Sequence, residues 1–79
     1  MEVDVKLTEM VAKRYSEGNR SLSLEIEEGS TIEDIMDHIG IPEKEYSYLM
    51  YTVNGKFLYE NKKINEGDEI KLFPIVGGG

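Results

Sequence analysis

The sequence has 79 residues, which is enough for one compact domain and too few for two. Sixteen acidic residues against nine basic residues give a formal charge of −7, which repels phosphates, so we expect no nucleic-acid partner and no membrane partner. Cysteine is absent and there is one histidine, which excludes disulfides, thiolate ligands and thiol nucleophiles, so we expect no metal site.

Two segments near the start have the two-residue period of half-buried strands. Apolar residues alternate with polar ones first at Val3, Val5 and Leu7, and then at Leu22, Leu24 and Ile26. Residues 8–20 separate the two segments and include the turn signal Gly18-Asn19. We therefore predict a hairpin with a long, partly irregular connection.

The strongest helix signal follows the second strand. The hydroxyl of Ser30 or Thr31 can cap the first turn, and Glu33, three residues beyond Ser30, completes a capping-box pattern. The apolar residues that follow have the spacing of one helical stripe: Ile32, Ile35, Met36 and Ile39. Gly40 suits a left-handed cap and Pro42 prevents continuation, so the helix is predicted to end at residue 39 or 40.

The second half of the chain reads as three short strands. Residues 43–47 are either a loop or a short helical turn, and residues 49–53 are rich in strand formers. Asn54-Gly55 tolerates the positive φ angles of a tight hairpin, so residues 56–59 are predicted to return as the next strand. Residues 66–68 form a turn before the last strand, 69–73, which Pro74 closes.

This order of elements predicts an α+β fold, in which a mixed sheet of four to five strands packs on one main helix. Residues 1–76 are expected to form a single domain, and residues 77–79 a flexible glycine tail. One helix covers one sheet face, so some apolar side chains should remain outside and suit a partner interface, among them Tyr48, Met50, Phe57, Leu58, Tyr59 and Phe73. The alternative is that most of them are core residues or scattered surface aromatics.

The glycine run Gly77-Gly78-Gly79 is the main chemical feature. Glycine lacks a β-carbon, so this segment can thread a channel too narrow for side chains, and the five residues after Pro74 reach at most about 17 Å. The Gly79 carboxylate is ionised and a poor electrophile, so it must be activated, and adenylation by a partner that uses ATP would do this. The sequence has no nucleotide motif and no Ser-His or Cys-His pair, so we expect no enzymatic activity and no cofactor bound by this chain. The alternative is a frayed end or the remnant of an expression tag.

The C-terminal segment NEGDEIKLFPIVGG, residues 65–78, resembles the signature of the small subunit of molybdopterin synthase, and the thiamine-pathway sulfur carrier is similar. Residues 10–15, 28–32 and 53–55 also resemble this ThiS/MoaD family of ubiquitin-like β-grasp proteins. The resemblance implies that an E1-like enzyme adenylates Gly79, which then becomes a thiocarboxylate that donates sulfur. It also implies a sulfurtransferase and the synthase large subunit as partners. The partner-binding residues would be Phe73, Pro74, Val76, Gly77 and Gly78.

The family pattern ends in two glycines and this sequence in three, so the native end is Gly78 or Gly79. Phe73-Pro74 and residues 12–14 favour the molybdopterin branch. Carriers for thiamine thiazole or tRNA thiolation, and a ubiquitin-like modifier that forms isopeptide bonds, share the fold and the tail. A non-catalytic interaction domain with an inert tail is the third alternative. No apolar run reaches the roughly 18 residues of a membrane span and the N-terminus lacks signal-peptide features, so we expect a cytoplasmic location.

Overall fold

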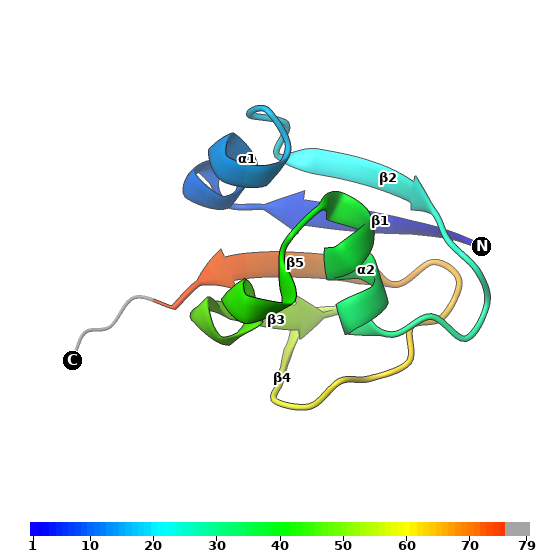
Figure 1. The fold of residues 1–79 in the computed structure, drawn as a ribbon. Helices are drawn as coiled ribbons and strands as arrows, with labels where there is room; N and C mark the ends of the chain where they lie inside the picture. Colours follow the sequence, from blue (N-terminus) through cyan, green and yellow to red (C-terminus); the bar gives the residue numbers. More distant parts are fainter. Residues whose placement is uncertain (76–79) are drawn as a thin grey trace.

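The computed structural model describes residues 1–75, so the predictions for Val76, Gly77, Gly78 and Gly79 fall outside the described residues. Along the chain the elements are β1 (Glu2–Leu7), α1 (Glu9–Tyr15), β2 (Ser21–Glu25), α2 (Ile32–Ile39), the 3-10 helix η1 (Glu43–Tyr48), β3 (Leu49–Val53), β4 (Lys56–Leu58) and β5 (Glu69–Pro74) (Figure 1). No helix in this part of the chain is long and apolar enough to cross a lipid bilayer.

The strands form one five-stranded mixed sheet in the order β2-β1-β5-β3-β4. The first and last strands, β1 and β5, lie side by side in parallel, and the other neighbours are antiparallel. Because β5 is the central strand, both of its edges are hydrogen-bonded to other strands. This confirms the predicted mixed sheet. It also means that the chain leaves the sheet from a strand that is hydrogen-bonded on both sides.

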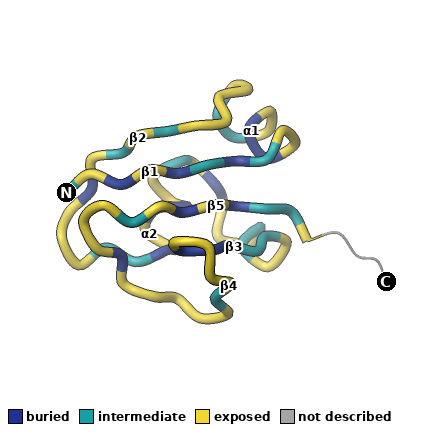
Figure 2. Tube along the Cα trace, turned by 180° about the vertical axis from the view of Figure 1, so that it is seen from behind, coloured by how far each residue is buried: buried dark blue, intermediate teal, exposed yellow. Residues whose placement is uncertain are grey.

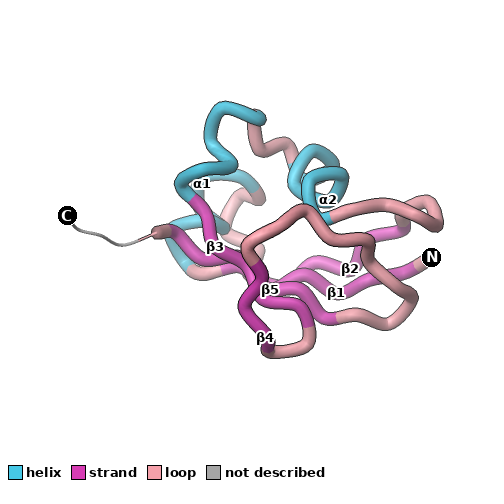
Figure 3. The backbone as a smooth tube through the Cα atoms, turned by 90° about the horizontal axis from the view of Figure 1, so that it is seen from below, coloured by secondary structure: helices cyan, strands magenta, loops and turns pink. Residues whose placement is uncertain are grey.

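One face of the sheet packs against the helices and forms the core. The three alternating residues of β1 are buried as predicted, and they contact the apolar side of α2 and the core face of β5. The cluster is made chiefly of Val3, Val5, Leu7, Ile32, Ile35, Met36, Ile70 and Leu72. Each such side chain contributes about 1.5–3 kcal/mol of transfer free energy when fully buried. Figure 3 shows both α-helices on this side of the sheet, and Figure 2 shows the opposite face, which we call the outer face.

The predicted hairpin is confirmed, because β1 and β2 pair antiparallel, but its long connection, residues 8–20, contains a helix that was not predicted, α1. It buries Val11 and Ala12 against the sheet, and Glu9 and Lys13 form an ion pair of 3.1 Å along its exposed side. A seven-residue helix completes only two turns, too few for a periodic apolar stripe. It is stable because of packing rather than intrinsic propensity.

The boundaries of α2 were predicted correctly and Thr31 was one of its two predicted caps, but the predicted capping-box pair of Ser30 and Glu33 was wrong. Of the two candidate caps, Thr31 is the one used, and its reciprocal partner is Asp34, not Glu33. Asp34 is the third helical residue after the cap, which is where a carboxylate can reach back to the capping amide. Gly40 ends the helix in the left-handed conformation with φ of 101°, as expected.

Smaller differences concern the second half. Residues 43–47, for which the sequence left a loop or a short turn open, belong to the 3-10 helix η1. The strand β4 ends one residue earlier than predicted, at Leu58. Pro74 does not follow the last strand but is its final residue, paired with Leu49 of β3.

Candidate functional site

The end of β5 is where the fold delivers the chain to its C-terminal residues. The last rung of the β3–β5 ladder pairs Pro74 with Leu49, and one residue further on the Ile75 amide donates a 2.8 Å hydrogen bond to the carbonyl oxygen of Tyr48. Figure 1 places this end of β5 beside α1, at the end of the sheet opposite the N-terminus. Ile75 is itself half exposed. The elements that surround the exit of the chain are therefore α1, η1 and β3.

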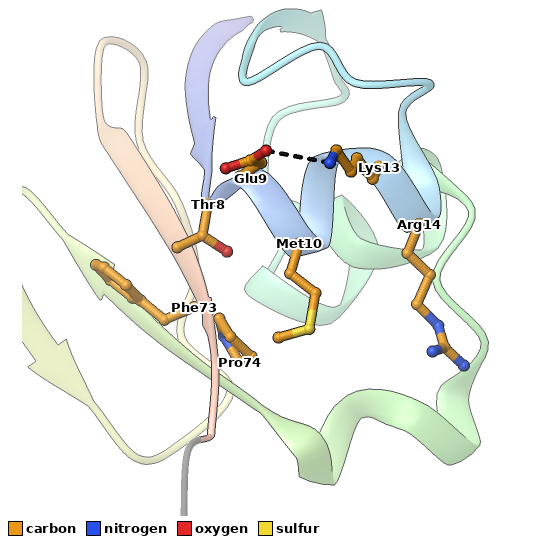
Figure 4. Close-up of a pocket in the computed structure, with 7 residues that line it drawn as sticks. All are labelled: Thr8, Glu9, Met10, Lys13, Arg14, Phe73 and Pro74. Carbon is orange, nitrogen blue, oxygen red and sulfur yellow. Dashed lines mark ion pairs between the residues drawn. The ribbon is translucent and has the colours of Figure 1, made fainter.

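A first cleft lies between α1 and the end of β5 (Figure 4). Its α1 side is amphipathic, because Met10 points toward Pro74 with 61% of its surface exposed, while Lys13 and Arg14 supply positive charge. The residues that line it are Thr8, Glu9, Met10, Lys13, Arg14, Phe73 and Pro74. An exposed methionine is adaptable, which suits contact with another protein. The cleft thus brings the two predicted site residues Phe73 and Pro74 together with α1.

A second cleft lies between α1, η1 and the chain exit at Pro74 and Ile75. Glu45 of η1 accepts a hydrogen bond from the Tyr15 hydroxyl and lies 3.4 Å from Nε of Arg14. The Tyr15 hydrogen bond is the main reason why the pKa of Glu45 is lowered, while burial is the main reason why the pKa of Tyr15 is raised. The three side chains form one network across the α1–η1 contact.

The outer face of the sheet exposes an apolar cluster beside the same exit. Met50 pairs with Phe73 across β3 and β5, and the rings of Phe57 and Phe73 lie 5.9 Å apart. We call Met50, Phe57 and Phe73 the outer-face patch. Phe57 is 49% exposed and the other two are half-buried. Of the side chains expected outside, Tyr48, Phe57 and Tyr59 are exposed, whereas Met50, Leu58 and Phe73 are half-buried.

Positive charge adjoins the outer-face patch although the chain is strongly acidic. The parallel pairing of β1 with β5 places Lys6 directly beside Lys71, on the same face as Phe73. The Lys6 ammonium donates to the Ser21 hydroxyl at 2.8 Å, and within residues 1–75 neither lysine forms an ion pair. Two adjacent cations without a carboxylate partner are complementary to an acidic surface.

Several residues around the exit were not singled out as functional from the sequence, namely Met10, Arg14, Tyr15, Glu45 and Ile75. The Glu9–Lys13 spacing of four residues, directly after Thr8, was the available signal for α1. Nothing local indicates that Glu45 meets α1, since Tyr15 and Glu45 are 30 positions apart. Within residues 1–75 no three histidine, aspartate or glutamate side chains gather so that they can hold a metal ion.

Comparisons with known proteins identify the family of the chain and solved structures with a similar fold. The model of the ThiS family matches residues 10–79. Similar solved structures include SAMP1 from Haloferax volcanii, with a TM-score of 0.77 and 23% identity over 100% of both chains. A putative molybdopterin converting factor subunit 1 from Pyrococcus furiosus has a TM-score of 0.76 and 19% identity over 96% of this chain and 99% of that chain.

A chain of the BexX/CysO complex from Amycolatopsis orientalis is also similar, with a TM-score of 0.64 and 22% identity over 98% of this chain and 99% of that chain. At these identities the solved structures establish the fold alone. They confirm the mixed sheet packed on a helix that the order of elements predicted, and the ubiquitin-like β-grasp that the family resemblance implied.

Proposed function

The chain belongs to the ThiS family of small carrier proteins, and on this premise we propose that it carries sulfur on the carboxyl group of Gly79. The proposal depends on the position of the glycine run, which begins three residues after Pro74. Pro74 is the last residue of the central strand β5 and lines both clefts. A carboxylate held on such a segment can enter a partner's active site while the domain stays outside. A cytoplasmic location is part of the same proposal.

The proposed chemistry takes place in partners. The Gly79 carboxylate attacks ATP held by an E1-like adenylating enzyme, which forms an acyl adenylate and releases pyrophosphate. A persulfide of the sulfurtransferase then attacks the acyl carbon and displaces AMP, which gives an acyl disulfide. A second thiol of a partner attacks the donor's sulfur in this disulfide, so that a disulfide forms between the two thiols and the thiocarboxylate is released on Gly79. The chain itself binds no cofactor and catalyses no step in this scheme; it presents the carboxyl group.

The outer-face patch and the two adjacent lysines are the proposed docking surface for the activating enzyme. Phe73 links this surface to the chain exit, because it belongs both to the patch and to the cleft beside α1. A partner with an apolar centre and an acidic rim fits this surface. Val76, Gly77 and Gly78 are proposed to enter the partner's channel.

Molybdopterin synthesis is the proposed pathway, with the synthase large subunit as the partner that uses the thiocarboxylate. It is supported by the resemblance of residues 65–78 and by the similarity to a protein named as a molybdopterin converting factor subunit. Deletion of the gene should abolish molybdoenzyme activity in its host. A normal molybdoenzyme level with a requirement for thiamine or loss of tRNA thiolation would assign the chain to one of the alternative pathways.

Intact mass spectrometry tests the carrier function itself. After incubation with ATP, the host's adenylating enzyme and a sulfur donor, we expect a mass increase equal to the replacement of one oxygen by sulfur. A chain that lacks Gly78 and Gly79 is the matched control and should gain nothing. If the complete chain is left unmodified under these conditions, or if the shortened chain still restores molybdoenzyme activity, the carrier proposal is wrong.

A ubiquitin-like modifier is the second candidate, favoured by the similarity to a structure named small archaeal modifier protein 1. In that case Gly79 would form an isopeptide bond with a lysine of a target protein. Trypsin cleaves after Lys71, so the remnant left on the target lysine would be residues 72–79. Peptide mapping of captured conjugates should find this branched remnant, and its absence under all growth conditions would exclude the modifier role.

A further inference from the structure

Glu45 is the residue at which α1 and η1 are joined. Its carboxylate accepts from the Tyr15 hydroxyl and pairs with Arg14, whose guanidinium lies 5.8 Å from the centre of the Tyr15 ring. The Glu45 side chain is 18% exposed, whereas that of Arg14 is 66% exposed, so the carboxylate lies inside the contact. Among the ion pairs of residues 1–75, this one alone joins two helices.

The short helix η1 depends on such contacts for its position. It has six residues, no side-chain cap and no buried residue, and the hydrogen bonds of a 3-10 helix are weaker than those of an α-helix. Glu45 fixes it to α1, and a 3.2 Å hydrogen bond from the Tyr46 hydroxyl to the carbonyl oxygen of Glu33 fixes it to α2. The placement of η1 is therefore decided by a small number of side chains.

The same helix holds the last described backbone contact of the C-terminal strand. Tyr48, the final residue of η1, accepts the hydrogen bond from the Ile75 amide at 2.8 Å. This bond lies one step beyond the last pair of the β3–β5 ladder, Leu49 with Pro74. The end of a ladder is where strands open first, so this bond is sensitive to any shift of η1.

We propose that Glu45 is a positioning residue for the C-terminal segment. By holding η1 against α1, it keeps the Tyr48 carbonyl in place to bind the Ile75 amide and so sets the direction in which the chain leaves the domain. Glu45 would also affect adenylation, an expectation that rests on the proposed function, because it orients the segment that carries the carboxyl group. The domain docks through the outer face, and a correctly directed segment raises the fraction of docked complexes in which the carboxyl group reaches ATP.

Amide hydrogen exchange of the isolated chain tests the positioning role directly. Glu45→Ala should accelerate exchange of the Ile75 amide about tenfold. The reference is the Asn54 amide, which donates to the Glu69 carbonyl oxygen at 2.8 Å at the other end of the same ladder and should not change. Glu43→Ala is the matched control, since it removes a carboxylate of the same helix that forms no ion pair with α1 among residues 1–75.

Two further variants separate the two contacts of the network. Glu45→Gln keeps an oxygen that accepts from Tyr15 and should recover part of the Ile75 protection, and Tyr15→Phe should accelerate Ile75 exchange in the same direction as Glu45→Ala. Unchanged Ile75 exchange in Glu45→Ala, or equal acceleration at Ile75 and Asn54, would overturn the proposal. Equal acceleration would mean that the substitution only lowers global stability.

Steady-state adenylation by the host's activating enzyme with ATP gives a second readout. Glu45→Ala should lower kcat about tenfold and leave KM for the chain unchanged, because the outer face is intact. A raised KM with unchanged kcat would place Glu45 in the docking surface and overturn the positioning role. If the wild-type chain is not adenylated at all, the proposed function fails, while the exchange measurement still decides whether Glu45 positions Ile75.

Discussion

At the α1–η1 contact, neighbouring side chains determine the ionisation of individual residues. The pKa of Glu45 is lowered first by the Tyr15 hydrogen bond and also by the positive charge of Arg14, against an opposing effect of burial. The pKa of Tyr15 is raised by its burial and by the negative charge of Glu45. Opposite shifts in the two partners are expected when a hydroxyl donates to a carboxylate.

Replacing Tyr15 by phenylalanine should therefore raise the pKa of Glu45 toward its ordinary value. The phenol is the largest cause of the lowered pKa, and phenylalanine keeps the ring beside Arg14 while removing the donor. The measurement is a titration of the Glu45 carboxyl group by NMR in both proteins. An identical pKa in the two proteins would show that the hydrogen bond does not form in solution.

The same pKa shifts predict the direction of the pH dependence of stability. A carboxyl group whose pKa is lowered by folding stabilises fully above its unfolded-state pKa, near pH 4.5, and this contribution is lost as the pH falls through the lower folded-state pKa. For Tyr15, whose pKa is raised, the contribution is present below about pH 10 and lost at higher pH. Urea denaturation at several pH values measures this. As the pH falls below about 4.5, the free energy of unfolding should decrease less for Tyr15→Phe than for the wild type.

At the scale of elements, α2 and α1 are stabilised by different interactions. The cap of α2 is local, since the Thr31 hydroxyl accepts from the Asp34 amide at 3.3 Å and the Asp34 carboxylate accepts from the Thr31 amide at 2.8 Å. The shorter α1 has an N-terminal residue, Thr8, that makes no side-chain cap hydrogen bond. It depends instead on its buried residues and on its contact with η1.

The cap predicts different costs for two adjacent acidic residues of α2. Asp34→Ala should lower the free energy of unfolding by about 1 kcal/mol, because it removes the capping box as well as a favourable charge at the helix start. Glu33→Ala removes a similar charge without a cap contact and should cost at most about half as much. Urea denaturation of both variants compares them, and equal losses would contradict the assigned cap.

At the scale of the whole molecule, the two faces of the sheet have separate roles. The core face stabilises the domain, since Ile70 and Leu72 of β5 are fully buried against α2 and β1. The outer face, shown in Figure 2, combines the apolar patch with Lys6 and Lys71. Adjacent residues of a strand point to opposite faces, so β5 contributes to both.

Substitutions on the two faces of β5 should therefore affect different properties. Ile70→Ala should lower the free energy of unfolding by about 2–5 kcal/mol, a large fraction of what a domain of this size has. Phe73→Ala should cost about 1 kcal/mol, because the ring is half-buried, but should raise KM in adenylation about tenfold. Chemical denaturation and steady-state kinetics separate the two effects, and an unchanged KM for Phe73→Ala would remove the outer face from the docking surface.

The elements that the sequence predicted are those whose signals are local. The alternation in β1, the stripe and end of α2, and the turn at Asn54-Gly55, where both residues have positive φ, each depend on backbone geometry within a few residues. The glycine run was also recognised as the chemical feature because its signal is local, three consecutive residues in the sequence. These patterns are sufficient for the fold class and for the proposed attachment point of sulfur.

Tertiary structure decided what surrounds that point. The short helix α1 exists because its buried residues pack on the sheet, which two turns of sequence do not reveal. Glu45 meets Tyr15 across 30 positions, and Lys6 adjoins Lys71 because the first and last strands pair in parallel. Contacts of this kind depend on which elements are neighbours in the folded chain, and local periodicity contains no information about that choice.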